Sequence, residues 1–195
     1  MGQGIRYAHI EAILKKYYRG GTVLEIAAGG CRYKDLFHDY LGTDIPSSTY
    51  YENRDLALFC DGQYLPFNDE SFDFMFVIGA FYQIKKPEFV IKEAFRILKP
   101  VGQLLVFDYN KPVLTRLKKI ENCGDNFNHI WHPRELEDMF KTCHFRTQIL
   151  LQVDYSSNFI GKILSVIYKI PGIYFISNTM FEGWNIIRAE KGSDK

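Results

Sequence analysis

The stretch Thr22–Cys31, which reads TVLEIAAGGC, constrains the fold more than any other part of the sequence. The apolar run 23–26, interrupted by Glu25, is typical of a strand buried in a parallel sheet. Small residues fill positions 27–30, where a sharp turn would bring the backbone close to a ligand. Apolar residues then recur at helical spacing from Tyr33 to Tyr40. This order of strand, turn and helix predicts the first unit of a nucleotide-binding α/β sheet, with helical N–H groups facing the ligand.

The rest of the chain alternates between strand and helix patterns. Further strands are predicted at 40–45, 57–60, 72–78, 104–107, 147–153 and 184–188, and helices at 7–18, 87–98 and 133–140. Such alternation indicates a mostly parallel sheet with right-handed crossovers. With 195 residues and 47% apolar content, we expect a single domain, 1–195. It would include an N-terminal helical segment, 1–21, and an apolar insertion, 155–182, before the last strand.

Composition excludes several classes of protein. The net charge of +1 gives no general attraction to nucleic acid or to acidic membranes. The four cysteines include no pair at CxxC spacing, so neither a metal site nor a disulfide framework is expected. No signal peptide opens the sequence, and the expected location is the cytoplasm.

Acidic residues follow the predicted strands at the edge where an open parallel sheet binds its ligands. Asp44 lies 19 positions after Glu25 and could accept both hydroxyls of a ribose; the alternative is a helix cap or a turn aspartate. Asp61 could accept a hydrogen bond from an adenine amino group, or it could be an ordinary surface-loop residue. Glu25 is costly to bury without a partner, and the structural alternative to a ligand is a core arginine.

Four stretches resemble the class I S-adenosylmethionine-dependent methyltransferases, in particular the group called methyltransferase type 11. They are TVLEIAAGGC, YLGTDI, CDGQYLPFNDESFDFMFVIGAF and EAFRILKPVGQLLVFD, and together they cover Val23 to Asp108. The glycine motif alone is a weak signal, whereas the long middle block is specific. The resemblance implies a Rossmann-like, doubly wound, mostly parallel sheet of seven strands, with the last strand antiparallel.

The resemblance also implies a set of cofactor-binding positions: Glu25, Ala27, Gly29, Asp44, Ile45, Asp61, Gly62 and Gly79. Glu25 would orient the methionine ammonium group of S-adenosylmethionine, and Asp44 would bind the ribose. Ile45 would pack beside the adenine, whose amino edge would meet Asp61 and Gly62. The small residues of the turn would pass close to the cofactor, and the glycine after the fourth strand would line the floor near its methionine part.

The sequence departs from the family pattern at the first and third motif glycines, which are Ala27 and Cys31 here. We expect Ala27 to fit with a negative φ, and Cys31 to start the following helix. Val101 replaces the first glycine of the LKPGG turn. The stretch Phe81–Gln83 stands where the family often has a histidine.

The implied reaction transfers a methyl group from the sulfonium of S-adenosylmethionine to an acceptor, leaving S-adenosylhomocysteine. The donor is already activated, so alignment and exclusion of water matter most. Candidate bases are Tyr82, Asp108, His129 and His132. Each has a structural alternative, such as a pocket wall for Tyr82, a strand-end cap for Asp108 and a helix N-cap for His132, so no catalytic residue is assigned.

Three functions compete on the sequence. The favoured one is a methyltransferase acting on a small-molecule acceptor. The second is a protein of the same fold that binds S-adenosylmethionine without catalysis. A nicotinamide-dependent dehydrogenase is disfavoured because G-x-G-x-x-G is absent and Glu25 lies inside the strand. A nucleic-acid acceptor is not expected without a basic stripe.

The segment 160–181 is too apolar for an ordinary surface connection. Its helical apolar face either completes the core, forms part of a lid over the acceptor site, or touches a membrane or a lipid-linked substrate. Lysines beside an apolar face suit an interfacial helix, so peripheral membrane association is one expectation.

Overall fold

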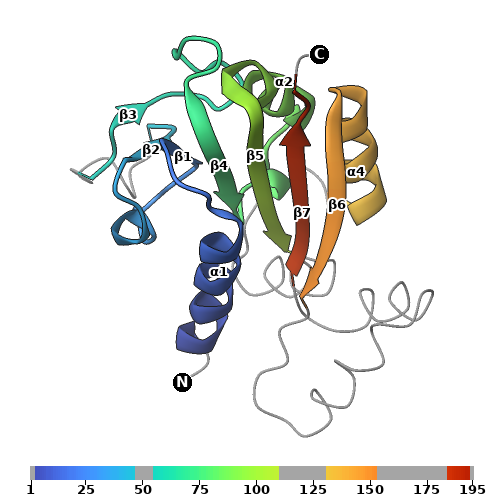
Figure 1. The fold of residues 1–195 in the computed structure, drawn as a ribbon. Helices are drawn as coiled ribbons and strands as arrows, with labels where there is room; N and C mark the ends of the chain where they lie inside the picture. The colour runs from blue at the N-terminus through green and yellow to red at the C-terminus, as the bar shows by residue number, and fades with distance from the viewer. Residues whose placement is uncertain (1–2, 47–54, 110–130, 153–183, 194–195) are drawn as a thin grey trace, which may run out of the picture.

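The chain folds around a seven-stranded sheet whose strand order is β3-β2-β1-β4-β5-β7-β6 (Figure 1). The computed structural model describes residues 3–46, 55–109, 131–152 and 184–193. The strands are β1 (Val23–Ile26), β2 (Tyr40–Asp44), β3 (Leu58–Phe59), β4 (Phe72–Ile78), β5 (Leu98–Tyr109), β6 (Phe145–Gln152) and β7 (Trp184–Lys191). The helices are α1 (Gln3–Tyr17), α2 (Pro87–Ile97) and α4 (Pro133–Thr142), with short 3₁₀ turns η1 (Lys34–Leu36) and η2 (Phe81–Gln83).

The strand directions confirm the expected topology. Strands β1 to β5 pair in parallel, whereas β7 runs antiparallel to both of its neighbours, β5 and β6. The order reverses between β1 and β4, because the chain first builds outward to β3 and then returns to the other side of β1. Such a reversal opens a crevice at the carboxyl ends of the strands, where α/β proteins of this kind bind ligands.

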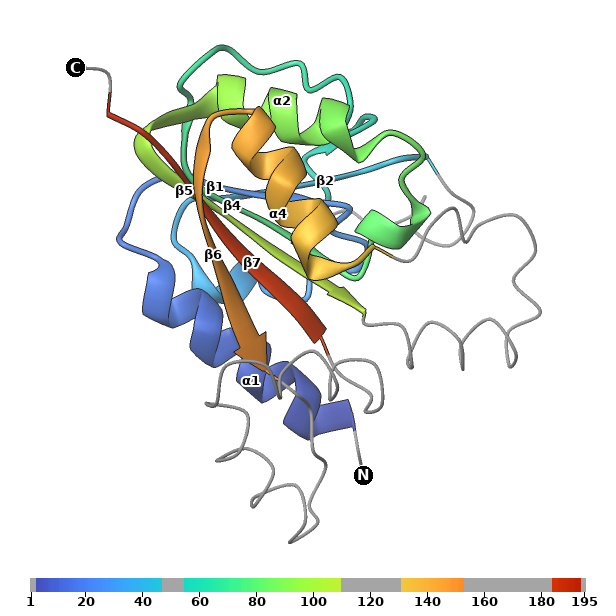
Figure 2. The same ribbon diagram turned by 90° about the vertical axis from the view of Figure 1, so that its right-hand side faces the viewer.

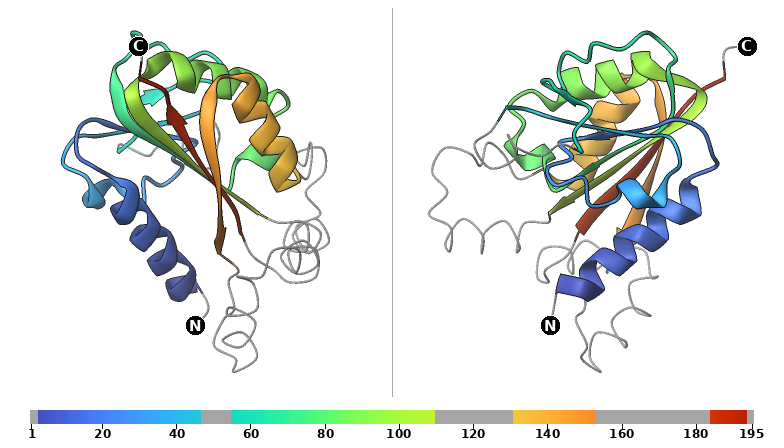
Figure 3. Two further views of the ribbon diagram at one scale, coloured as in Figure 1. Left: turned by 45° about the vertical axis from the view of Figure 1, so that its right-hand side comes forward. Right: turned by 90° about the vertical axis from the view of Figure 1, so that its left-hand side faces the viewer.

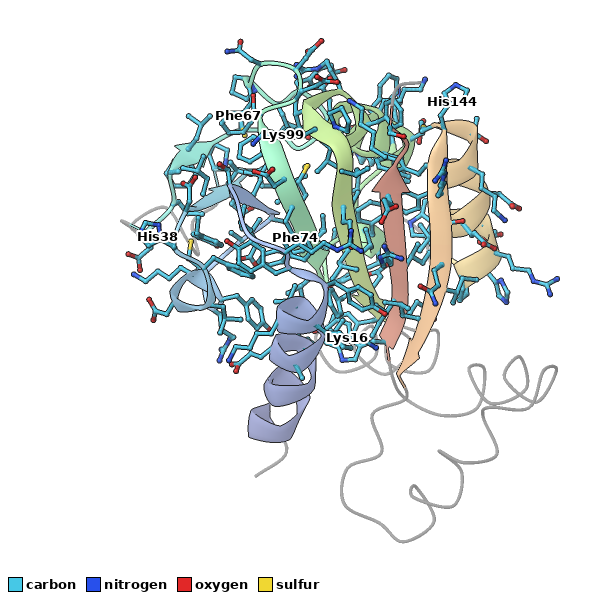
Figure 4. The ribbon with its side chains drawn as sticks, viewed as in Figure 1. Lys16, His38, Phe67, Phe74, Lys99 and His144 are labelled. Atoms are coloured by element: carbon cyan, nitrogen blue, oxygen red, sulfur yellow. The ribbon has the colours of Figure 1, made fainter. Side chains whose placement is uncertain are left out.

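Helices cover both faces of the sheet. Helix α1 lies on one face, and α2 and α4 lie on the other (Figures 2 and 3). Side chains of β4 alternate between the two faces of the sheet. Phe74 and Phe76 pack on the α1 side, whereas Met75 and Val77 belong to the core under α2 and α4. Figure 4 shows Phe74 next to the C-terminal end of α1, where its ring lies 5.8 Å from that of Tyr18.

The prediction of a helix between Tyr33 and Tyr40 is wrong. Only the 3₁₀ turn η1 forms there, and Tyr40 already begins β2. The connection is too short for a helix and two turns. The aromatic spacing reflects burial instead, since the rings of Tyr33 and Phe37 both pack on Phe76, with centroids 6.1 and 5.6 Å away. A ligand in this turn therefore meets turn backbone rather than the N-terminus of an α-helix.

Other boundaries also differ from the expectation. Strand β5 begins at Leu98 rather than 104, because the segment expected as a turn bulges within the strand, where Val101 has φ 59°. Strand β3 is shorter than predicted, with two residues. No described helix is long and apolar enough to cross a membrane. The insertion 155–182, the segment 160–181 and His129 lie outside the described residues.

Candidate functional site

A cavity of about 300 Å³ opens at the point where the strand order reverses. Its walls come from the ends of β1 and β2, the loop after β3, the segment after β4, and α2. The lining residues are Ile26, Ala27, Asp44, Ile45, Cys60, Asp61, Gly62, Gln63, Ala80, Gln83, Ile84, Lys85 and Val90. The lining is mostly apolar with a few carboxylates at one side, as in sites for small molecules and cofactors.

Five of the eight cofactor positions expected from the sequence line this cavity: Ala27, Asp44, Ile45, Asp61 and Gly62. They are far apart in sequence, yet the parallel pairing of β1, β2 and β3 brings their carboxyl ends together. The other three positions, Glu25, Gly29 and Gly79, do not line the cavity in this structure.

The turn after β1 is held in a left-handed conformation at each position of the glycine motif. Ala27, Gly29 and Cys31 have φ values of 57°, 52° and 49°. The expectations of a negative φ at Ala27 and of a helix start at Cys31 are therefore wrong. The turn is tight because its backbone hydrogen bonds are local or run to β2, from Cys31 N to Ala28 O at 2.8 Å and from Ala28 N to Thr43 O at 2.9 Å.

Asp44 ties this turn to the end of β2. Its Oδ2 accepts the Gly29 N–H at 2.8 Å, and its Oδ1 accepts the Ile45 N–H at 2.7 Å. Each carboxylate oxygen has a second lone pair, so the group can still accept ligand hydroxyls at the cavity wall. The side chain of Ile45 is 54% exposed and offers an apolar surface beside it.

Asp61 holds the loop that follows β3. Its Oδ1 accepts the Gln63 N–H at 2.9 Å, and its carbonyl oxygen accepts the Tyr64 N–H at 2.9 Å. Gly62 lies next to β1, since a Cβ there would come within 2.8 Å of Ile26 Cγ2. A side chain at Gly62 would therefore push the loop away from the cavity.

Helix α2 fixes the continuation of this loop. Arg96 donates from Nη2 to the Leu65 carbonyl at 2.9 Å and from Nη1 to the Phe67 carbonyl at 2.7 Å. Glu93 accepts the Leu65 N–H at 2.9 Å, and its hydrogen bond with Arg96 lowers the pKa of its carboxyl. The wall of the cavity is thus anchored to a helix rather than to the two-residue strand β3.

Glu25 is buried inside β1, with 3% of its surface exposed. Burial raises the pKa of Glu25 to about 8, the hydrogen bond from Tyr40 lowers it, and the nearby charge of Asp44 raises it. The Tyr40 hydroxyl donates to Glu25 Oε2. Among the described residues, Glu25 is therefore held by a tyrosine rather than by the arginine that the structural alternative required.

Sequence reasoning missed Tyr40 as the partner of Glu25. In the structure, parallel pairing of β1 and β2 sets Glu25 opposite Gly42 and leaves Tyr40 two residues earlier on the same face. The long tyrosine side chain can reach Glu25 across Gly42, because glycine has no side chain to block the path. Only the strand register, which the sequence pattern does not specify, could have revealed this contact.

Gly79 ends β4 in a left-handed conformation, with φ 64°. Its N–H donates to the Phe107 carbonyl at 2.7 Å, and a Cβ at this position would lie 3.2 Å from the Tyr109 ring. Glycine is needed there because the chain must turn beneath that ring.

The candidate bases have different surroundings. Tyr82 is buried and its hydroxyl accepts a hydrogen bond from Gln83 Nε2 at 2.7 Å. His132 caps α4, accepting the Arg134 N–H while Glu135 accepts the His132 N–H, so the helix-cap alternative holds.

Asp108 is fully buried within β5 rather than at a solvent-facing strand end. Burial raises the pKa of Asp108 to about 8, partly opposed by the backbone N–H groups of two tyrosines.

Comparison with known proteins finds a family model that resembles part of the chain. Residues 24–106 match the family model described as "Methyltransferase domain". This match confirms, over residues 24–106, the resemblance seen in the sequence.

Two curated relatives match about half of the chain. Uncharacterized protein MJ1123 from Methanocaldococcus jannaschii is 33% identical over 102 residues, covering 51% of this chain and 49% of its own length. The ubiquinone/menaquinone biosynthesis C-methyltransferase UbiE from Paraburkholderia xenovorans is 32% identical over 117 residues, with shares of 52% and 48%. The chain thus spans about half the length of these relatives.

A solved structure has a similar fold. Phosphoethanolamine N-methyltransferase 2 from Haemonchus contortus, in complex with S-adenosyl-L-methionine, superposes with a TM-score of 0.66 at 16% identity. The superposition covers 96% of this chain and 53% of that one.

The left-handed conformation of the turn after β1 leads to a prediction about stability. We expect Ala27→Gly to raise the free energy of unfolding by about 0.5–1 kcal/mol. A left-handed φ costs an L-residue about 1–2 kcal/mol, and the greater freedom of glycine in the unfolded chain offsets part of the gain. Urea unfolding would measure the difference. Ala28→Gly, whose φ is not positive, is the control and should destabilise. A less stable Ala27→Gly variant would contradict the argument.

The buried carboxyl of Asp108 leads to a second prediction, about how stability depends on pH. Its pKa of about 8 lies far above its ordinary value of 3.8, so between these values the folded protein holds a proton that the unfolded chain has released. Stability must therefore fall as pH rises, by about 1.4 kcal/mol per pH unit for such a group. Asp108→Asn should remove that contribution from urea unfolding measured at pH 5, 6 and 7. An unchanged slope in the variant would show that Asp108 is ionised in the folded protein.

Proposed function

We propose that the protein is an S-adenosylmethionine-dependent methyltransferase that acts on a small-molecule acceptor. The observation that carries this proposal is the single cavity wall formed by Ala27, Asp44, Ile45, Asp61 and Gly62 at the point where the strand order reverses. Open α/β sheets bind nucleotide-like ligands in this crevice. The family match over residues 24–106 supports the same chemistry.

The residues present fit the cofactor. A ribose needs a carboxylate with free lone pairs, and Asp44 offers one that its bonds to Gly29 and Ile45 hold in place. An adenine needs an apolar slot, and Ile26, Ile45 and Val90 line the cavity. The cofactor bound by the Haemonchus contortus structure of the same fold is consistent with this fit.

The protein's own task in such a reaction is positioning. The bound cofactor would supply a methyl group that is already activated for transfer. The carboxylates at the ends of β2 and β3 would fix the nucleoside end, and the apolar lining would exclude water. The acceptor would approach from beyond the ends of β4 and β5. A small-molecule acceptor agrees with the curated relative UbiE, whose name describes methylation in quinone biosynthesis.

Asp44→Ala tests the cofactor site directly. We expect calorimetry to show binding of S-adenosylmethionine weakened at least about tenfold, because charge-assisted hydrogen bonds to the ribose are lost. Asp35→Ala is the matched control, since it removes the same charge from an exposed position on η1.

Both variants should first be shown to unfold cooperatively. Unchanged affinity in a folded Asp44→Ala protein would rule out the ribose assignment. A wild-type protein that binds the cofactor yet transfers no methyl group to any acceptor in a metabolite panel would favour a binding protein without catalysis.

A further inference from the structure

The turn that begins at Asp61 forms part of the cavity wall and is held mainly at its two ends. Within the turn, Asp61 Oδ1 accepts the Gln63 N–H at 2.9 Å. Its outer side is open, since Tyr64 is 71% exposed. One end is joined to β2, because the Cys60 N–H donates to a β2 carbonyl at 2.9 Å. Since β3 has only two residues, the other end, at Leu65, decides how firmly the turn is held against the cavity.

Both backbone polar groups of Leu65 bind side chains of α2. Its N–H donates to Glu93 Oε2 at 2.9 Å, and its carbonyl accepts a hydrogen bond from Arg96 Nη2 at 2.9 Å. The side chain of Leu65 is 3% exposed and packs in the core between the sheet and α2. The loop between β3 and β4 therefore runs along α2 (Figure 2), and Leu65 is the point where this helix fixes the turn.

Arg96 uses all five of its N–H donors in this contact. Nε and Nη2 donate to the two oxygens of Glu93 at 3.0 and 2.8 Å. Nη1 donates to the Phe67 carbonyl at 2.7 Å and to Asp69 Oδ1 at 2.8 Å, and the fifth bond is the one to Leu65. A guanidinium presents these donors in a rigid plane, whereas the ammonium of lysine has the same charge but no such fork. The arrangement thus depends on the shape of arginine as well as on its charge.

The Asp61 carboxylate can still accept a hydrogen bond from a ligand. Its Oδ2 accepts Gln63 Nε2 at 3.0 Å and retains a second lone pair. Gly62 holds the backbone against β1, where a Cβ would come within 2.8 Å of Ile26 Cγ2. Hydrogen bonds need a donor and an acceptor about 2.7–3.2 Å apart, so an outward shift of the turn by about 1 Å would remove a ligand contact. Recognition at Asp61 therefore depends on how tightly the turn is held.

We propose that Arg96, paired with Glu93, is a positioning residue that sets the preference of the cavity for an adenine base. It acts through Leu65 and the turn at Asp61, since it does not itself line the cavity. The inference rests on the proposed function, because it needs the nucleoside end of the cofactor beside this turn. A general loss of stability weakens the binding of every ligand alike, whereas a displaced Asp61 weakens only ligands with a donor on the base.

Arg96→Lys tests the inference, with S-adenosylhomocysteine and S-inosylhomocysteine as the two ligands. The first carries an amino group on its base, and the second carries a carbonyl oxygen at the same position. We expect calorimetry to show that wild-type protein prefers the adenine ligand about tenfold and that the variant keeps only about a twofold preference. An unchanged preference in folded Arg96→Lys protein would mean that Arg96 only supports the fold, and would overturn the inference.

Arg188→Lys is the matched control variant. Arg188 also donates to a glutamate, Glu190, and its Nε donates to Gln103 Oε1 at 2.9 Å. It lies on β7 over the ring of Tyr17 in α1, on the face of the sheet opposite to α2. The control should keep the wild-type preference for the adenine ligand. An equal loss of preference in both variants would show a general effect of removing a guanidinium and would also count against the inference.

A double-mutant cycle tests whether Arg96 acts through Asp61. Asp61→Ala should remove the preference by itself, and adding Arg96→Lys should then change it no further, because both act on one contact. A further fall in the double variant would contradict the proposed route. If Arg96→Lys does not fold, Glu93→Gln decides the question, since it keeps the shape of the partner and removes its charge. A wild-type preference in folded Glu93→Gln protein would overturn the inference.

The same titrations separate this inference from the proposed function. Wild-type protein that bound neither ligand would contradict the proposed function itself. Wild-type protein that bound both ligands equally would leave the proposed function standing and overturn the inference, because there would be no preference for Arg96 to set.

Discussion

The hydrogen bond from the Gly29 N–H to Asp44 fixes the turn after β1 against the end of β2. At 2.8 Å it extends the contact that the parallel pairing of the two strands begins. The left-handed conformation of Ala27 and Cys31 is tolerated because this bond and the hydrogen bonds to β2 determine the path of the turn. The cavity wall exists because that path leaves the strand ends open.

The turn also explains how a chain can depart from a glycine motif and keep its shape. Alanine and cysteine adopt the same region of φ as glycine here. The free energy that this conformation costs is offset by the surrounding contacts. Cys31 gains buried contacts in return, since it is 2% exposed and its Sγ lies close to Gly42. A missing motif glycine is therefore weak grounds for denying a binding site.

The sequence predicted the sheet well where burial alone decides the structure. Strand β4 has the predicted bounds because a run such as FDFMFVI fits only a strand that is covered on both faces. The helix predicted before Tyr40 failed because aromatic rings at helical spacing can be buried just as well by a 3₁₀ turn. The site was predicted in part: strand-end residues such as Asp44 could be found by position, whereas Tyr40 depends on strand register.

The position of β7 in the sheet has a consequence for how the chain reaches this structure during synthesis. Strand β7 lies between β5 and β6, although β6 comes before it in the chain. When β6 has left the ribosome, the strand that will join it to the sheet has not yet been made. The edge of β5 and the whole of β6 therefore stay unpaired until residue 191 has emerged, and cotranslational folding must protect these exposed strand edges from pairing with other chains.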